Sequence, residues 1–253
     1  MNVLELSHVS RSFGSVKAVS DFSMTAEKGQ IVGVIGPNGA GKTTIFNVIS
    51  GIYTADSGSV YLNGEDITRR RQDVIAQMGL ARTFQNIRLF KGMTCLENVM
   101  TTFDARVKYT MLDMFLKLPR MRRAEREGRA QCMEELRWVG LEAYADEKPE
   151  NLPYGLQRRL EIARALALRP IVVLLDEPAA GLNPKEVSEL TDTIRRIRDE
   201  RGATILLIEH RLEVIMTISD KIYVQNFGET ISVGTPAQCQ SDVRVIRAYL
   251  GED

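Results

Sequence analysis

Residues 31–44 read IVGVIGPNGAGKTT, and this stretch decides the fold. Its first part, Ile31–Ile35, is a short apolar run rich in β-branched residues, which predicts a buried strand. Its second part, Gly36–Thr43, has the spacing G-x-x-x-x-G-K-[ST] of a phosphate-binding loop, and a helix is expected at Gly41–Ser50. Glycine lets successive backbone N–H groups face an anion, and a helix N-terminus adds partial positive charge. The stretch therefore predicts a nucleotide-binding strand, loop and helix.

The motif also predicts a role for each residue of the loop. Lys42 is expected to contact the β- and γ-phosphates, and the Thr43 hydroxyl is expected to ligate Mg²⁺. A chance glycine-rich turn is the alternative, which the flanking strand and helix disfavour. The expected nucleotide contacts are Gly36, Pro37, Asn38, Gly39, Ala40, Gly41, Lys42, Thr43 and Thr44.

A second apolar run, IVVLLDEP at Ile171–Pro178, ends in two adjacent carboxylates. Ligand sites in open α/β sheets gather at the carboxyl ends of parallel strands. At such an edge Asp176 is expected to hold Mg²⁺ through water, and Glu177 to polarise an attacking water. The alternative is an acidic turn without a chemical role, which the preceding loop motif disfavours. The Asn-Lys-x-Asp motif with which GTPases read their base is absent, so ATP is expected rather than GTP.

Strand and helix signals alternate along the rest of the chain, which predicts a mostly parallel sheet covered by helices. From residue 91 to 165 the pattern is helical, with a capping box at Thr94 and Glu97. The expected fold class is an α/β P-loop NTPase core, residues 1–90 and 166–253, with an antiparallel β subdomain and an inserted α-helical subdomain, residues 91–165. The expected strands are Val3–Leu6, Asp21–Met24, Ile31–Ile35, Ser59–Leu62, Leu80–Phe84, Ile171–Leu175, Thr204–Ile208 and Ile222–Gln225. Further helices are expected at Arg120–Val139, Pro184–Arg201 and Leu212–Ile218.

Composition limits the class of partner. Lys+Arg and Asp+Glu both number 33 among 253 residues, so no net charge attracts nucleic acid or an acidic membrane surface. A basic run at residues 120–129, RMRRAEREGR, is a candidate nucleic-acid patch, but Glu125 and Glu127 interrupt it and a solvated helix face is favoured.

Cysteine and histidine are scarce. The three cysteines are far apart and form no CxxC spacing, which favours reduced thiols over disulfides. The two histidines, His8 and His210, argue against a histidine-based metal site. No secretory signal pattern is present, and the most apolar stretch, residues 165–182, is interrupted by charges, so no membrane-spanning segment is expected.

Further motifs resemble one known family, the ATP-binding cassette (ABC) proteins that drive ABC transporters. GPNGAGKTT resembles their Walker A segment, and IVVLLDEPAAGLNP resembles Walker B with the D-loop. TFQN, residues 83–86, resembles the Q-loop, and ILLIEH, residues 205–210, resembles the strand that ends in the switch histidine. Phe13 in SRSFG stands where the family stacks an aromatic ring on adenine. The motifs occur in the family's order over nearly the whole chain.

The resemblance implies further residue roles. Gln85 is expected to ligate Mg²⁺ and to sense the membrane partner, and His210 to hydrogen-bond the γ-phosphate; a core histidine is the alternative for His210. Asn183 replaces the more usual D-loop aspartate and is an expected nucleotide contact. Glu177, His210 and Lys42 are thus the expected catalytic residues, with ATP and Mg²⁺ as cofactors.

The stretch NLPYGLQRRLEIARALALRP, residues 151–170, stands where the family carries its signature sequence Leu-Ser-Gly-Gly-Gln. In the family this helix end contacts the γ-phosphate of ATP bound to the opposite subunit. Pro153 supplies neither a hydroxyl nor an N–H, but the N–H groups of Tyr154, Gly155 and Leu156 are expected to be free to face an anion. Tyr154 either covers the site or packs beside it, and the sequence leaves both open.

Longer segments, among them RTFQNIRLF, RRLEIARAL and VIRAYLGED, resemble the ATP-binding subunits of bacterial branched-chain amino-acid importers. Similar cassettes serve urea import and lipopolysaccharide export. The resemblance implies two transmembrane permease subunits, a second cassette of the same or a related kind and, indirectly, a solute-binding protein, but no nucleic acid. It implies a peripheral position on the cytoplasmic face of the inner membrane. An ATPase acting on nucleic acid or the ribosome, and a cassette that binds ATP without hydrolysis, are the competing classes.

Overall fold

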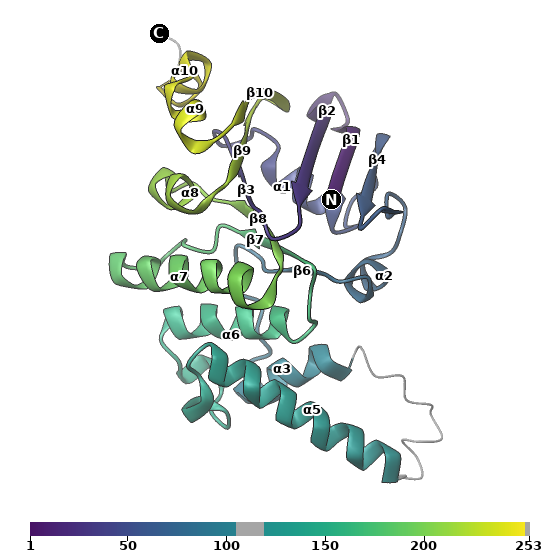
Figure 1. Ribbon diagram of the computed structural model, residues 1–253, viewed down its shortest axis with the longest axis vertical. Coiled ribbons are helices and arrows are strands. Elements are labelled where there is room, and N and C mark those ends of the chain that lie inside the picture. The colour runs from purple at the N-terminus through teal and green to yellow at the C-terminus, as the bar shows by residue number, and fades with distance from the viewer. Residues whose placement is uncertain (105–118, 251–253) are drawn as a thin grey trace. The chain divides into compact units, whose positions relative to one another are not determined.

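The structure, a computed structural model, describes residues 1–104 and 119–250 (Figure 1). Contacts between residues divide the chain into two compact units. The first unit comprises Met1–Gln85 and Ile171–Asp253, and the second comprises Asn86–Pro170. The division therefore falls at residues 85 and 171, a few residues from the boundaries at 90 and 166 expected from the sequence.

A six-stranded sheet in the first unit carries both sequence motifs. Its order is β10-β9-β3-β8-β7-β6, and every neighbouring pair is parallel except β10 with β9. Every residue of β3, β7 and β8 is buried, as expected for central strands of a covered parallel sheet. Because these strands are parallel, the phosphate-binding loop after β3 and the carboxylates at the end of β7 reach the same edge. The strands are β3 (Ile31–Ile35), β6 (Leu80–Arg82), β7 (Val172–Asp176), β8 (Thr204–Ile208), β9 (Lys221–Asn226) and β10 (Glu229–Gly234).

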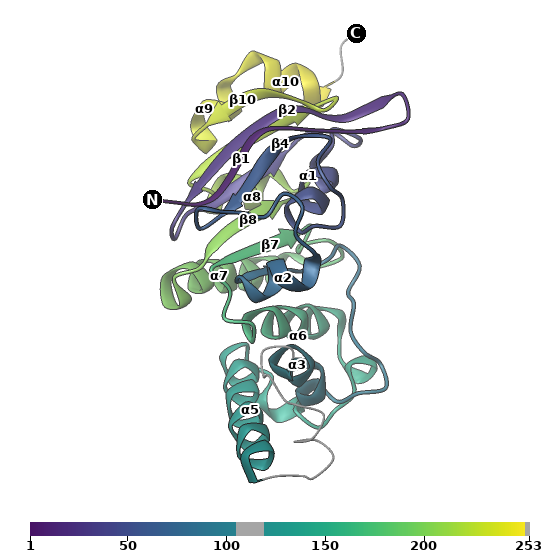
Figure 2. The same cartoon turned by 90° about the vertical axis from the view of Figure 1, so that its right-hand side faces the viewer.

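The other sheet of this unit is antiparallel, with the order β2-β1-β4-β5. Its strands are β1 (Asn2–Phe13), β2 (Val16–Glu27), β4 (Ser57–Leu62) and β5 (Glu65–Asp66). Figure 2 shows β1, β2 and β4 side by side. The expected strands Val3–Leu6 and Asp21–Met24 are only parts of β1 and β2. Asn63 and Gly64, with φ of 49° and 82°, form the tight turn between β4 and β5.

Helix α1 (Lys42–Ile49) contributes to the core that these sheets share. Its residues Ile45, Phe46 and Ile49 are fully buried. The same apolar cluster contains Leu6 of β1 and Leu206 of β8. The helix that starts at the phosphate-binding loop is therefore held by packing along its length.

The remaining helices of the first unit are α2 (Gln72–Gln77), α7 (Pro184–Arg201), α8 (Leu212–Ile218), α9 (Pro236–Ser241) and α10 (Val243–Leu250). Helix α8 packs closely on β3, because a Cβ at Gly33 would lie 2.9 Å from the Ser219 Oγ and 3.1 Å from a methyl group of Ile215. The expected bounds of α7 and α8 agree with the structure.

The second unit is helical in its described part. Its helices are α3 (Cys95–Asp104), α5 (Pro119–Trp138) and α6 (Tyr154–Leu166), with short 3-10 turns at Glu142–Tyr144 and Pro149–Asn151. The capping box is confirmed, since the Thr94 N–H donates to Glu97 Oε2 at 2.8 Å and the Glu97 N–H donates to Thr94 Oγ1 at 3.2 Å. In the basic run, Arg123 and Glu127 form an exposed ion pair at 2.9 Å, which fits a solvated helix face; the side chains of residues 120–122 lie outside the described part.

All three cysteines, Cys95, Cys132 and Cys239, are buried, and none of them is in a disulfide. Over residues 1–104 and 119–250, no helix is both long and apolar enough to cross a lipid bilayer.

Candidate active site

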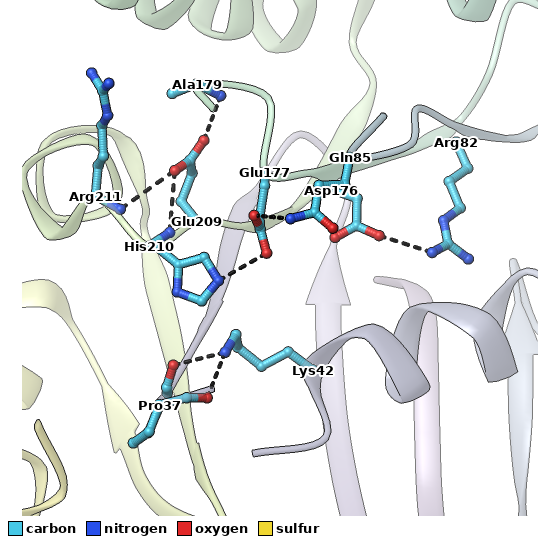
Figure 3. A network of polar contacts seen from close by, with 11 residues as sticks. Pro37, Lys42, Arg82, Gln85, Asp176, Glu177, Ala179, Glu209, His210 and Arg211 are labelled. Atoms are coloured by element: carbon cyan, nitrogen blue, oxygen red, sulfur yellow. Dashed lines mark hydrogen bonds and ion pairs between the residues drawn. The ribbon is translucent and has the colours of Figure 1, made fainter. Parts of the chain in front are cut away.

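Lys42, the first residue of α1, is turned back onto the phosphate-binding loop (Figure 3). Its side chain is buried, and Nζ donates to the carbonyl oxygens of Gly36 at 2.7 Å and Pro37 at 2.8 Å. Burial lowers the pKa of Lys42, and the carboxylates of Glu177 and Asp176 oppose this effect. The ammonium group is thus held at the mouth of the loop by two neutral acceptors and by nearby negative charge.

The loop offers unused backbone donors next to Lys42. Within the described part of the chain, the N–H groups of Gly39, Gly41, Lys42 and Thr43 donate no hydrogen bond. The N–H of Ala40, by contrast, donates to the Pro37 carbonyl at 3.2 Å. Free N–H groups around a helix N-terminus form an anion-binding concavity, so the geometry of the loop suits phosphate.

Gly41 is a position of the loop that has no room for a side chain. Its φ of 95° is left-handed, and a Cβ there would lie 2.1 Å from the Ala18 carbonyl oxygen. Gly41→Ala should therefore lower the free energy of unfolding by about 1–3 kcal/mol from the backbone conformation alone, and more once the clash is included. ATP affinity, measured by calorimetry, should fall at least about tenfold, since 1.4 kcal/mol of lost interaction suffices.

Gly92→Ala is the matched control, because a Cβ at Gly92 meets nothing within 4 Å. It should leave both quantities unchanged. Wild-type ATP affinity in the Gly41→Ala variant would contradict the loop geometry described above.

Asp176, the last residue of β7, is buried and bound on one side only. Its Oδ2 accepts a hydrogen bond from Arg82 Nη2 at 2.9 Å. Its Oδ1 is buried without a hydrogen-bond partner in the described structure. Burial raises the pKa of the Asp176 carboxyl, against the opposing effect of Arg82. A buried carboxylate oxygen without a donor is costly unless a ligand satisfies it.

Glu177 follows directly, and two side chains hold its carboxylate. Gln85 Nε2 donates to Oε2 at 2.6 Å, and His210 Nε2 lies 2.8 Å from Oε1. Figure 3 shows Glu177 between these two residues. The backbone φ of Glu177 is 47°, a left-handed conformation that is uncommon for a residue other than glycine. The structure thus brings together Gln85, Glu177 and His210, which lie far apart in the sequence.

Glu209 is a residue of this network that the sequence analysis missed. Its side chain is buried and accepts from the N–H groups of Ala179 at 2.5 Å, His210 at 3.2 Å and Arg211 at 3.4 Å. Burial raises the pKa of Glu209, and these N–H groups oppose the rise. Glu209 therefore joins the turn after β7 to the turn after β8 that carries His210. The only sequence signal was an acidic residue directly before that histidine.

Phe13, at the end of β1, is part of an exposed aromatic cluster. Phe13 is 40% exposed, and its ring meets the Tyr53 ring edge-on at a centroid distance of 5.1 Å. The Arg11 guanidinium lies 5.0 Å from the Phe13 centroid and 5.7 Å from the Tyr53 centroid. An accessible aromatic face suits stacking on a base, and Tyr53 is a neighbour that the sequence analysis did not single out.

Asn183 is the N-cap of α7. Its Oδ1 accepts from the Glu186 N–H at 3.0 Å, and Glu186 Oε2 accepts from the Asn183 N–H at 2.9 Å. Together they form a capping box that fixes the start of the helix. The structure therefore shows Asn183 as the capping residue of α7.

Helix α6 of the helical unit begins at the signature-like stretch. The N–H groups of Tyr154 and Gly155 donate no hydrogen bond in the described part. The expectation for Leu156 is wrong, because its N–H donates to the Pro153 carbonyl at 3.0 Å. Pro153 is the N-cap of α6, and the carbonyl of an N-cap residue accepts the first hydrogen bond of its helix, which uses that donor.

Tyr154 is anchored at its hydroxyl, which accepts from Arg158 Nη2 at 3.3 Å. Arg158 is itself almost fully buried and pairs with Glu161 at 2.7 Å. Tyr154 as a whole remains 42% exposed. Its hydroxyl therefore packs against its own helix, while part of the residue is open to solvent.

A buried parallel strand, a glycine loop with free N–H groups and a carboxylate pair on a neighbouring strand define a P-loop nucleotide-binding protein of the α/β class. Comparison with known proteins narrows the class. The family described as "ABC transporter" matches residues 19–180, and the chain belongs to that family.

Two relatives align over nearly their whole length. The "High-affinity branched-chain amino acid transport ATP-binding protein BraF" of Pseudomonas aeruginosa is 44% identical over 250 residues, which cover 99% of this chain and 98% of that protein. The "Lipopolysaccharide export system ATP-binding protein LptB" of Haemophilus influenzae is 35% identical over 252 residues, which cover 100% and 98%.

A solved structure confirms the expected fold class. The crystal structure of the ADP conformation of an ATP-binding cassette of an ABC transporter superposes with a TM-score of 0.85 at 30% identity, covering 100% of both chains. The α/β P-loop core with antiparallel strands and inserted helices is therefore the fold of ABC cassettes, as the sequence resemblance implied.

Proposed function

We propose that this chain is the ATP-hydrolysing motor subunit of an ABC transporter that imports branched-chain amino acids. One observation carries the proposal for hydrolysis: the Glu177 carboxylate is held between Gln85 and His210, at the sheet edge that also carries Lys42. A chain that only bound ATP would need neither an oriented carboxylate nor a histidine against it.

The loop is proposed to bind the phosphates of ATP. The free N–H groups of Gly39, Gly41, Lys42 and Thr43 would donate to phosphate oxygens. Lys42 would exchange the carbonyls of Gly36 and Pro37 for the β- and γ-phosphates, gaining charge-assisted hydrogen bonds. The residues Gly36, Pro37, Asn38, Ala40 and Thr44 complete this loop. Phe13, with Tyr53 beside it, would offer its ring to the adenine.

The side chains present fit a magnesium ion. The buried Oδ1 of Asp176 has no donor in the described structure, and such an oxygen suits a cation or its bound water. Thr43 and Gln85 would supply the other oxygen ligands, together with the phosphates, as is usual for Mg²⁺ in sites that bind nucleotides. When bound, Mg²⁺ would neutralise charge on the phosphates during transfer.

Glu177 and His210 are proposed to act on the attacking water and the γ-phosphate. Glu177 would accept a hydrogen bond from the water and orient it in line with the terminal phosphorus. His210 would hydrogen-bond a γ-phosphate oxygen, and its present contact with Glu177 keeps both groups at the site. Gln85 would bring its amide to the metal and relay contact with a membrane partner, since it is the last residue of the first unit.

The partners are proposed from the family. Two copies of this chain, or this chain and a related cassette, would each place the start of α6, with Tyr154 and Gly155, against ATP on the other subunit. Their free N–H groups suit the γ-phosphate, and Asn183 would lie close by. Two transmembrane permease subunits would anchor the pair at the cytoplasmic face of the inner membrane, and a solute-binding protein would deliver the solute. No nucleic acid is proposed as a partner.

The direction of transport is proposed from the relatives. The protein named for branched-chain amino-acid transport is 44% identical to this chain, whereas the one named for lipopolysaccharide export is 35% identical. Import of branched-chain amino acids is therefore favoured over lipopolysaccharide export.

Uptake by cells tests the proposal. A strain that lacks this chain should lose ATP-dependent uptake of radiolabelled leucine, isoleucine and valine, and the wild-type gene should restore it. Unchanged uptake of all three, together with impaired lipopolysaccharide export, would overturn import in favour of export.

A further inference from the structure

Arg82, the last residue of β6, is buried at the junction of three elements in the first unit. Its Nη2 donates to Asp176 Oδ2 at 2.9 Å. The Arg82 side chain is 6% exposed and that of Asp176 is 4% exposed. Its Nη1 donates to Asn47 Oδ1 and to Ser50 Oγ, each at 2.8 Å. One guanidinium thus ties the carboxyl end of β7 to the C-terminal end of α1, and Figure 3 shows its bond to Asp176.

The three proposed magnesium ligands lie on these elements or shortly after them. Thr43 lies in the first turn of α1, Asp176 ends β7, and Gln85 follows Arg82 by three residues. A small octahedral cation tolerates little error in the positions of its ligands. A rigid connection between these elements is therefore what a preformed magnesium site requires.

We propose that Arg82 is a positioning residue for the magnesium site, which fixes the placement of Thr43, Gln85 and Asp176 and commits Asp176 to metal binding through Oδ1 by occupying Oδ2. The inference rests on the proposed nucleotide site and adds to it a residue that does not itself touch nucleotide or metal.

The geometry explains why the residue is arginine. A guanidinium presents donors in a planar fork, so it reaches Asp176 with one nitrogen and Asn47 and Ser50 with the other. Its carbon lies 5.6 Å from the Phe46 ring centroid and 4.9 Å from that of Phe84, contacts that suit a weakly hydrated, delocalised cation. A lysine keeps the charge but cannot span both sides, so Arg82→Lys separates geometry from charge.

The test measures how much Mg²⁺ strengthens ATP binding. ATP affinity of the full chain is determined by calorimetry with excess Mg²⁺ and with a chelator, and the ratio of the two dissociation constants is the readout. Arg82→Lys should reduce this ratio about tenfold while leaving the dissociation constant in chelator within about twofold, because the loop itself is untouched. Arg71→Lys, an exposed arginine paired with Asp73, is the matched control and should leave the ratio unchanged.

Thermal unfolding without ligand distinguishes a purely structural role. If Arg82→Lys lowers the unfolding temperature but keeps the wild-type ratio, the proposal is overturned. Ser50→Ala is a milder second variant that removes one acceptor of Arg82 and leaves the ion pair with Asp176, and it should reduce the ratio by a smaller factor. If Arg82→Lys does not fold, Ser50→Ala becomes the test, and an unchanged ratio of dissociation constants in that variant also overturns the proposal. If the wild-type chain binds ATP equally with Mg²⁺ and chelator, the proposed site itself fails instead.

Discussion

Replacing Glu177 with glutamine should lower kcat for ATP hydrolysis by about a hundred- to ten-thousand-fold, the range contributed by a positioned general base. Glutamine keeps the size of the side chain, so Gln85 and His210 keep a partner at 2.6–2.8 Å from the same position. What is lost is the negative charge that draws a proton from the attacking water. ATP affinity should change little, because the phosphate contacts of the loop are unaffected.

Phosphate release and calorimetry together measure this result, and gel filtration in ATP should show an accumulated dimer because the nucleotide is no longer consumed. Glu213→Gln is a suitable control: it is an exposed glutamate in the first turn of α8, three residues beyond His210. Normal turnover in Glu177→Gln would mean that another group activates the water.

Replacing Lys42 with alanine should weaken ATP binding by at least about a hundredfold. Each charge-assisted hydrogen bond to phosphate contributes about 1.5–3 kcal/mol, and Lys42 is proposed to make two. The loss is therefore about 3 kcal/mol or more, or two powers of ten in the dissociation constant. The ammonium is already buried beside the loop, so no cost of bringing it there offsets the contribution.

Calorimetry of the purified chain measures the affinity, with Lys17→Ala as an exposed lysine control. Lys42 also bonds to the Gly36 and Pro37 carbonyls, so unfolding of the unliganded variant should be followed as well. Lys42→Met retains the apolar stem and keeps the test valid if the alanine variant is unstable. Unchanged ATP affinity in both variants would contradict the assignment of residues 36–43 as the phosphate-binding loop.

Much of the first unit was predictable because its local patterns are strong. The bounds of β3, β8, α7 and α8 agree with the ranges expected from the sequence. Strands β3 and β8 are continuous apolar runs, and α7 is an amphipathic helix that begins with a capping box. The lengths of β1 and β2 were underestimated. Register shifts and left-handed backbone at His8 and Asp21 interrupt the alternation of apolar and polar residues along these strands. Strand β10 and helices α2, α9 and α10 were not predicted, as their segments are only six to eight residues long.

The residues of the candidate site also differ in how strong a signal the sequence carries for them. Lys42, Asp176 and Glu177 carry readable signals, because the loop spacing and the acidic end of a buried strand reflect their chemistry. Gln85 and His210 were predicted from the resemblance of their motifs to one family. Arg82 and Glu209 carry no such signal. Their roles depend on partners 94 and 30 residues away along the chain, which only pairing between strands brings within bonding distance.

The sequence by itself determined that this chain has a phosphate-binding loop, a carboxylate pair after a buried strand and the order of motifs found in ABC cassettes. Local spacing suffices for these, because the backbone N–H groups of a glycine loop need only their own neighbours. Only the tertiary structure decided that one oxygen of Asp176 is already taken by Arg82, that Glu177 is held from two sides, and that the Leu156 N–H is used within its own helix turn. Each of these is a hydrogen bond, and its partner depends on where the folded backbone places the donor and the acceptor.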